Sequence, residues 1–448
     1  MGKTPKLIAV AVAISLTVAV FSLLLYSTLM KKQNNDAGIP GPKMYLSGQK
    51  VAVMTNHPHV RASEALADWF QRETGAVVQN LVINYEDMAR FAIEDAASPH
   101  PQLDVIMFWY VDLGELAKRR VLADLTDFIS ENAAVIQPGD FVTSVYDPYT
   151  LYQGRRFALP YDGDTHVLFY RKSLLRKYNF FPPETWDDYL NISRTITEGE
   201  KDAGIFGSAI MAPDNPMVIV SSFMNRLGGY GGKLLDERGA PALDSPEAKL
   251  ALESLVQQAK YALPSPLETD WEVSRDAFLT GRAAMVEQWT DIGVMAEDST
   301  QSLIKGDWGV VRMPKGSGEK AAHTPALNAG FSLGLSSRAP NPDAARAYLL
   351  FANRPDITLK LNLINGGIDP VRVSVLKSPA YRDFAPDLHG AVQAALERAA
   401  PWPTVPEAPR LLGILTKYLI LTLEGQMQPA EALDQIQAQW SAVLKKGD

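Results

Sequence analysis

The sequence predicts an α/β protein made of two lobes, between which the chain crosses more than once. Three observations support this prediction. Short apolar runs alternate with helix-length amphipathic segments, two long extended stretches lack the helix expected beside each of them, and 448 residues suffice for two lobes. Strands separated by helices favour right-handed βαβ units, so we expect mixed, mostly parallel sheets flanked by helices.

The first elements of the body alternate in a regular order. Apolar runs typical of buried strands occur at 51–55, 77–83 and 103–109. Helices are expected where apolar residues recur at helical spacing, namely from 62 to Gly75, from 88 to Ser98, and over 113–129. Glycine is common just past the end of a helix, so Gly75 is expected to end the first one.

Later elements are marked by helix-start signals. Asp244-Ser245-Pro246-Glu247 combines capping residues, a proline suited to the first turn, and an acid. Asn341-Pro342-Asp343 repeats this pattern, and from Asp387 onward the chain reads as successive helices. The extended stretches 157–171 and 327–335 are expected to cross between two sheets, which makes the lobes discontinuous and leaves a cleft between them.

Composition and charge exclude several classes of protein. The chain is 46% hydrophobic and 21% charged, which excludes disorder, and it has no cysteine, which excludes disulfide scaffolds, iron–sulfur centres, cysteine nucleophiles and cysteine-borne lipids. Beyond residue 32 the chain has 39 basic and 51 acidic residues, a net charge of −12 that argues against a nucleic-acid partner. The only close histidine pair, His57 and His59, flanks a proline, so no metal or cofactor is expected.

The N-terminus is the least ordinary part of the sequence. Residues 7–30 carry no charge and are bounded by Lys6 and Lys31. This run is longer than the roughly 7–15 apolar residues of a secretory signal, and about 20 residues suffice to cross a bilayer. We therefore predict a signal or anchor helix over 1–32, a linker over 33–48 and a body exported to the periplasm and tethered to the inner membrane. The alternative is a cleaved signal and a soluble periplasmic protein.

One motif suggests an enzyme. Gly330 to Gly334 matches the G-x-S-x-G turn of serine hydrolases, with Ser332 as the nucleophile. That turn needs a helix directly after the serine, whereas apolar residues continue to Leu335 and the next helix start is Asn341. Ser332 is therefore expected inside a strand, and a serine hydrolase is a weak alternative.

Other residues suggest a binding site. Trp109 ends the third strand, at the edge where open α/β sheets bind ligands. Trp289 is followed by Thr290-Asp291, and a tryptophan face beside a carboxylate suits a sugar. Asp162-Gly163-Asp164 lacks the spacing of a calcium loop and is either a turn or a polar part of the cleft.

Four segments together resemble one family. They are LPYDGDTHVLFYRKSLLRKY (159–178), AFLTGRAAMVEQWTDIG (277–293), GFSLGLSSRAPNPDAARAYLLF (330–351) and GGIDPVRVSVL (366–376). In this order and spacing they resemble the carbohydrate-type extracellular solute-binding proteins of ABC importers, the maltodextrin-binding-like group. The resemblance covers residues 50–445.

The resemblance implies a periplasmic-binding-protein-like fold with a sugar-binding cleft. Lobe 1 would comprise 49–160 and 328–370, and lobe 2 would comprise 161–327 and 371–448. The protein would be a monomer without enzymatic activity that binds a carbohydrate and delivers it to the permease subunits of an ABC transporter; a membrane-tethered ligand sensor is the alternative on the same fold. The ligand contacts carried over from the family are Asn56, Trp109, Asp162, Asp164, Tyr230, Trp289, Gly367, Asp369 and Arg372.

Overall fold

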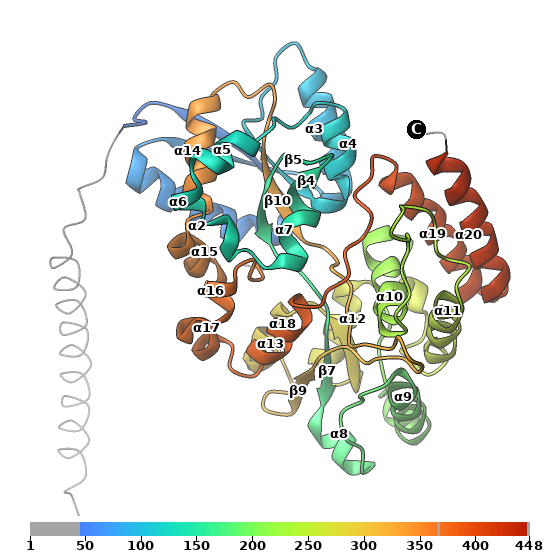
Figure 1. Ribbon diagram of the computed structural model, residues 1–448. Coiled ribbons are helices and arrows are strands. Elements are labelled where there is room, and N and C mark those ends of the chain that lie inside the picture. Colours follow the sequence, from blue (N-terminus) through green and yellow to red (C-terminus); the bar gives the residue numbers. More distant parts are fainter. Residues whose placement is uncertain (1–44, 365–367, 446–448) are drawn as a thin grey trace, which may run out of the picture.

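The computed structural model describes residues 45–364 and 368–445 (Figure 1). The predicted helix over 1–32 and most of the predicted linker lie outside the described residues. Within the range predicted as linker, Leu46 is buried and its N–H donates to the Thr74 carbonyl at 3.0 Å. This residue therefore packs against the folded body. Within the described ranges, no helix combines the length and the apolar character needed to cross a bilayer.

The first sheet has five strands in the order β2-β1-β3-β10-β6. Their bounds are β1 (Lys50–Thr55), β2 (Val77–Val82), β3 (Val105–Trp109), β6 (Leu159–Asp162) and β10 (Phe331–Leu335). The three predicted apolar runs are confirmed as β1, β2 and β3, which pair in parallel through β1. β10 pairs antiparallel with both β3 and β6, so this sheet is mixed.

The second sheet has three strands in the order β8-β7-β9, and both pairings are antiparallel. Their bounds are β7 (Val167–Arg171), β8 (Met285–Gln288) and β9 (Trp308–Val311), and a separate short hairpin joins β4 (Leu151–Tyr152) to β5 (Arg155–Arg156). The prediction of mostly parallel sheets is therefore wrong for the described strands. Parallel order comes from βαβ units, whereas β10 enters the first sheet from the second and runs against its neighbour β3.

Local start and stop signals correctly predicted several helices. These are α2 (Val60–Thr74), α3 (Met88–Ala97), α11 (Pro246–Ala259), α14 (Pro342–Ala352), α18 (His389–Leu396), α19 (Ala408–Leu423) and α20 (Pro429–Leu444). Gly75 ends α2 with φ 80°, a left-handed conformation that glycine adopts readily. The Ser245 side chain accepts a hydrogen bond from the N–H of Ala248 at the start of α11.

The predicted continuous helix over 113–129 is wrong, because two short helices replace it. They are α4 (Leu113–Lys118) and α5 (Thr126–Glu131). Between them, Arg120 has φ 56° and Leu122 pairs antiparallel with Ser336 next to β10. Leu116, Val121 and Leu125, which suggested one helix face, are all buried, but Val121 and Leu125 lie in the irregular segment between the two helices.

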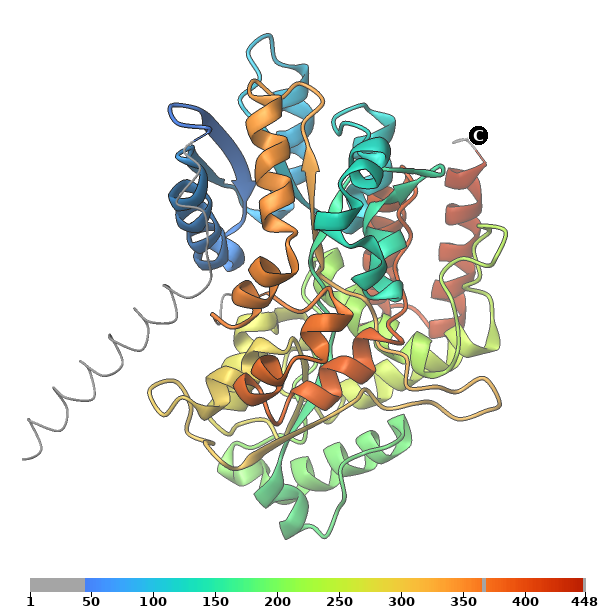
Figure 2. The same cartoon turned by 60° about the vertical axis from the view of Figure 1, so that its left-hand side comes forward.

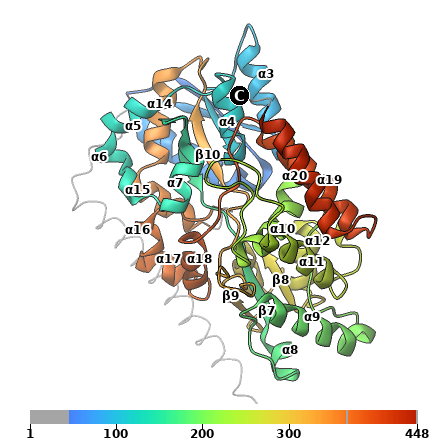
Figure 3. The ribbon, with the colours of Figure 1, turned by 45° about the vertical axis from the view of Figure 1, so that its right-hand side comes forward.

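The helices cover the two sheets separately. The other α-helices of the described residues are, in chain order, α6 (Ala133–Ile136), α7 (Thr143–Thr150), α8 (Lys172–Lys177), α9 (Trp186–Glu200), α10 (Pro216–Gly229), α12 (Trp271–Leu279), α13 (Asp291–Glu297), α15 (Pro355–Asn362), α16 (Val373–Leu376) and α17 (Pro379–Phe384). Figure 2 shows α14 running alongside β10 of the first sheet. Figure 3 shows α19 and α20 beside α10 and α11, against which they pack.

Two segments carry the chain between the sheets, where the extended stretches were predicted. Residues 163–166 join β6 to β7, and residues 312–330 join β9 to β10. These segments lie side by side, since Thr165 pairs with Leu327 and the N–H of Asn328 donates to the Asp164 carbonyl at 3.3 Å. The junction of the two sheets therefore has an extended backbone from two distant parts of the sequence.

Candidate ligand-binding site

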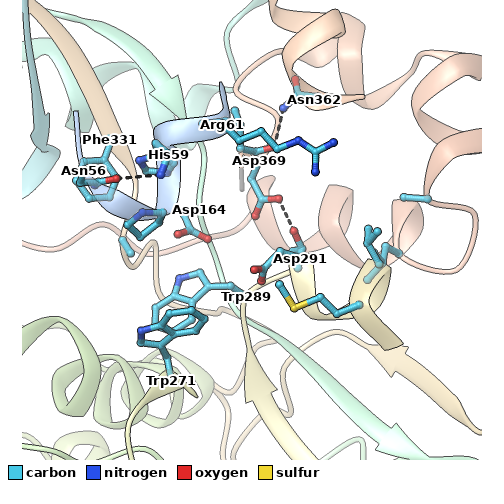
Figure 4. Close-up of a pocket in the computed structure, with 18 of the residues that line it drawn as sticks. Asn56, His59, Arg61, Asp164, Trp271, Trp289, Asp291, Phe331, Asn362 and Asp369 are labelled. Atoms are coloured by element: carbon cyan, nitrogen blue, oxygen red, sulfur yellow. Dashed lines mark hydrogen bonds between the residues drawn. The ribbon is translucent and has the colours of Figure 1, made fainter. Parts of the chain in front are cut away.

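A cavity of about 460 Å³ lies at this junction (Figure 4). Its lining comes mainly from residues after the carboxyl ends of β1, β2 and β8, from both crossing segments, and from α17 and the residues between α17 and α18. The carboxyl ends of parallel strands are the edge at which open α/β sheets bind ligands. The arrangement thus places side chains of both sheets around one space.

The floor of the cavity depends on a close contact between the first crossing segment and residues 369–370. The N–H of Gly163 donates to the Asp369 carbonyl at 3.2 Å, and the N–H of Asp369 donates to Asp162 Oδ1 at 2.7 Å. A Cβ added at Gly163 would lie 2.4 Å from the Pro370 carbonyl oxygen. Glycine is required here because the two backbones approach too closely for a side chain.

Three carboxylates line the cavity: Asp164, Asp291 and Asp369. Figure 4 shows them pointing toward the same space. Burial, followed by the negative charge of Asp162 and the other carboxylates, raises the pKa of Asp164 and of Asp369 well above the usual range. Burial also raises the pKa of Asp291. The site therefore concentrates acidic groups that resist ionising together.

Asp162 lies directly behind this group and is almost fully buried. Its Oδ2 is 3.0 Å from His59 Nε2, while its Oδ1 accepts the N–H of Asp369. Asp162 therefore uses both oxygens to hold the segments together rather than to line the cavity.

Aromatic side chains form the opposite part of the lining. Trp289 and Trp271 lie below the carboxylates in Figure 4, and Phe331 lies beside Asn56. The Trp289 ring packs edge-on against His166, with 4.5 Å between ring centroids. Trp289 Nε1 has no hydrogen-bond partner among the described residues. The Trp289 side chain therefore lines the cavity, while its unpaired N–H is buried in this conformation.

A buried polar network supports Trp289 from behind. Asn225 Nδ2 bonds to His166 Nδ1 at 2.9 Å and donates to Glu287 Oε2 at 3.1 Å, and Glu287 pairs with Arg226 at 2.6 Å. Burial and the charge of Arg226 lower the pKa of His166 to about 3. His166 is therefore neutral at physiological pH and orients the indole as an uncharged ring.

Four of the nine sequence-predicted contacts line the cavity: Asn56, Asp164, Trp289 and Asp369. Asn56 also caps the short helix η1 (His57–His59), with its Oδ1 accepting the His59 N–H at 3.1 Å. Its Nδ2 has no partner among the described residues. Gly367 lies outside the described residues.

The structure places Trp109, Tyr230 and Arg372, three other predicted contacts, away from the lining. The Trp109 indole N–H donates to the Asn328 carbonyl at 2.8 Å, and its ring packs edge-on against Trp402. Tyr230 is buried at the end of α10, against Gly316. Both side chains therefore contact the protein itself.

Arg372 is fully buried and also lies away from the cavity. Its guanidinium donates to the carbonyls of Ile136 and Asn353, faces Asp140 at 3.4 Å and lies 4.1 Å from the Phe141 ring centroid. Burial lowers its pKa, while Asp140 opposes that change. Its contacts join the segment after residue 368 to lobe-1 residues.

Several lining residues were not among the predicted contacts, namely His59, Arg61, Tyr85, Trp271, Asp291 and Asn362. Asp291 could have been found, because it follows Trp289 by two residues and the pair had already suggested a sugar site. Trp271 and Asn362 belong to distant helices and carry no local signal.

The structure argues against the hydrolase alternative. Ser332 lies within β10, as predicted, and is fully buried. Its hydroxyl donates to the Tyr149 carbonyl at 2.9 Å, so no substrate can reach it in this conformation. Over residues 45–364 and 368–445, no three histidine, aspartate or glutamate side chains are arranged to hold a metal ion.

Comparison with known proteins agrees with this architecture. The chain is 24% identical over 427 residues to a probable amino-acid ABC transporter periplasmic-binding protein of Sinorhizobium fredii, covering 94% of this chain and 95% of that one. A maltose-bound MalE3 of T. maritima superimposes with a TM-score of 0.78 at 24% identity, over 88% of this chain and 100% of that one. A ribitol complex of an ABC transporter solute-binding protein from Agrobacterium radiobacter gives 0.77 at 24% identity, over 89% and 99%.

These solved structures share the two-lobed α/β fold seen here. The family model of bacterial extracellular solute-binding proteins matches residues 56–358, which is well over half of the sequence. This chain therefore belongs to the bacterial extracellular solute-binding protein family.

Proposed function

We propose that this protein is the substrate-binding component of an ABC importer and that its cavity binds a sugar or polyol. The observation that carries this proposal is the lining itself, in which the faces of Trp289 and Trp271 lie opposite carboxylate and amide groups. An aromatic face packs against the C–H groups of a sugar ring, while carboxylates and amides bond to its hydroxyls. The Agrobacterium relative is in complex with ribitol and the T. maritima relative with maltose, which supports this ligand class.

Binding would couple to closure of the two lobes. The lining comes from residues 56–61 next to the first sheet and from residues 289–295 next to the second, so a ligand that contacts both favours the closed arrangement. Only the difference in affinity between open and closed forms shifts their equilibrium. The crossing residues 163–166 and 327–330, with the third crossing at 370–371, would act as the hinge between lobe 1 (49–160 and 328–370) and lobe 2 (161–327 and 371–448).

The test is a Trp289→Ala variant, measured by calorimetry after a thermal-shift screen of sugars and polyols has identified a ligand. We expect affinity to fall at least tenfold, because the variant loses the stacking face of the cavity. Trp69→Ala is the matched control: Trp69 is also half-buried, but it lies on α2 outside the lining. Unchanged affinity in Trp289→Ala, in a variant with native circular dichroism, would contradict the proposed site.

We also infer that residues 7–30 export the protein and then hold it at the inner membrane. The run is uncharged and long enough to cross a bilayer as one helix of about 20 residues. Tethering would keep the binding body close to its permease.

A further inference from the structure

The cavity gathers three carboxyl groups with few basic side chains beside them. Asp164, Asp291 and Asp369 line it, and Asp162 lies directly behind them. Arg61 is the one arginine or lysine among the described lining residues. In Figure 4 its guanidinium extends past the three carboxylates rather than toward them.

The remaining basic groups near the site are already occupied. His59 Nε2 lies 3.0 Å from Asp162, and Arg275 lies over the Trp271 ring and bonds to Asp276. Among the described residues, no arginine, lysine or histidine forms a salt bridge with Asp164, Asp291 or Asp369, although the charge of Arg275 acts against burial on the pKa of Asp291.

A second observation concerns the hydrogen-bond partners of the Asp369 carboxylate. Asp369 is 9% exposed, and its Oδ1 accepts the hydroxyl of Thr290. Its Oδ2 is buried and has no hydrogen-bond donor among the described residues. A buried carboxylate oxygen without a donor is unfavourable, so a group from outside the protein is expected to donate to it.

We infer, building on the proposed function, that the ligand is an amine-bearing sugar or polyol whose ammonium group binds between Asp164, Asp291 and Asp369. An ammonium offers three N–H donors together with a positive charge, which matches three converging acceptors. The face of Trp289 adds a favourable cation–π contact. Hydroxyl groups of the same ligand would bond to the amides of Asn56 and Asn362.

A neutral ligand and an ammonium would use different protonation states of the same site. Burial and mutual repulsion raise the pKa of Asp164 and Asp369, so a neutral ligand would meet protonated carboxyl groups that donate hydrogen bonds to its hydroxyls, whereas an ammonium would favour the ionised carboxylates. The two possibilities predict opposite effects of an amine, so matched ligands separate them.

The experiment is calorimetric titration near neutral pH with glucose, glucosamine and N-acetylglucosamine, and with sorbitol and 1-amino-1-deoxysorbitol. We expect each amine to bind at least tenfold more tightly than its hydroxyl counterpart, which is the range of a hydrogen bond between charged groups. Acetylation removes the charge, so N-acetylglucosamine should lose that gain.

Variants locate the effect at the carboxylates. Asp369→Asn and Asp164→Asn should each weaken binding of an amine about tenfold more than they weaken binding of its hydroxyl counterpart. Asp343→Asn, an exposed position on α14, removes the same charge outside the cavity and should change neither. If Asp369→Asn does not fold, Asp164→Asn and Asp291→Asn carry the test.

The outcomes distinguish this inference from the proposed function. Equal or tighter binding of glucose or sorbitol would overturn the inference and leave a neutral sugar or polyol site standing. Retained affinity of N-acetylglucosamine would also overturn it. If no compound of either kind binds, the inference and the proposed function both fail.

Discussion

Gly163 shows how one residue fixes the geometry of the cavity. It lies between Asp162 and Asp164, and its backbone contacts the Asp369–Pro370 segment directly. Because residue 163 has no side chain, this contact can form, and it places Asp162 behind the cavity and Asp164 and Asp369 in its lining. The positions of these carboxylates thus depend on a residue without a functional group.

Gly163→Ala should therefore destabilise the protein. An added Cβ would lie 2.4 Å from a backbone oxygen that cannot rotate away, and overpacking of this kind costs about 1–3 kcal/mol. Ligand affinity should fall as well, because Asp164 and Asp369 would be displaced. Denaturant unfolding and calorimetry measure the two effects.

Gly413→Ala is the matched control for this substitution. Gly413 lies within α19, and a Cβ there would meet no atom within 4 Å. Alanine should stabilise the helix by about 0.5–1 kcal/mol and leave ligand affinity unchanged. A Gly163→Ala protein as stable as the parent would show that the two backbones are not constrained as described.

At the scale of elements, a helix or its end could be predicted when the residues that determine it are close together in the sequence. Gly75 and Ser245 mark helix ends through bonds made within a few residues, so α2 and α11 could be predicted from sequence. The break between α4 and α5 could not, because Leu122 pairs with Ser336, which is more than two hundred residues away in the sequence. Apolar spacing indicates burial, but not which partner buries the segment.

The N-terminal segment is an element that can be tested separately. If residues 7–30 form an anchor, full-length protein expressed in a Gram-negative host should remain in the inner-membrane fraction after high-salt washing. Its intact mass should include residues 1–32. A chain starting at residue 33 or later in the soluble periplasmic fraction would show a cleaved signal instead.

At the scale of the whole molecule, the acidic cavity should affect stability as well as binding. The raised pKa values of Asp164 and Asp369 mean that the folded protein retains protons which the unfolded chain has released. Their contribution to stability is therefore present at acid pH and is lost as pH rises from the usual aspartate value of 3.8 toward the raised values.

We predict that Asp164→Asn will raise the melting temperature of the ligand-free protein at neutral and alkaline pH relative to the parent. The amide cannot ionise, so the repulsion with Asp162 and Asp369 disappears. Melting curves from pH 4 to 9 measure this difference, which should shrink toward the acid end. Asp343→Asn removes a first-turn acid of α14, so it should lower the melting temperature slightly and by the same amount at every pH at which the aspartate is ionised. A destabilised Asp164→Asn at alkaline pH would contradict the prediction.

The sequence by itself determined the alternation of strands and helices, the helix ends at Gly75 and Ser245, and the extended segments that connect the two sheets. These features depend on periodicity and on short-range hydrogen bonds, which are written along the chain. It also selected residues of the right type for a binding site. Among these, Trp289 and Asp369 line the cavity, while Arg372 is buried against the carbonyls of Ile136 and Asn353.

Only the tertiary structure decided which of these residues line the cavity and which are buried elsewhere. It also decided that β10 runs antiparallel to β3 and that Asp164, Asp291 and Asp369 come together. An arginine that binds a ligand and one that joins buried backbone segments have the same chemistry. What separates them is the set of atoms that folding brings within a few ångströms from distant parts of the chain, and no local pattern specifies that set.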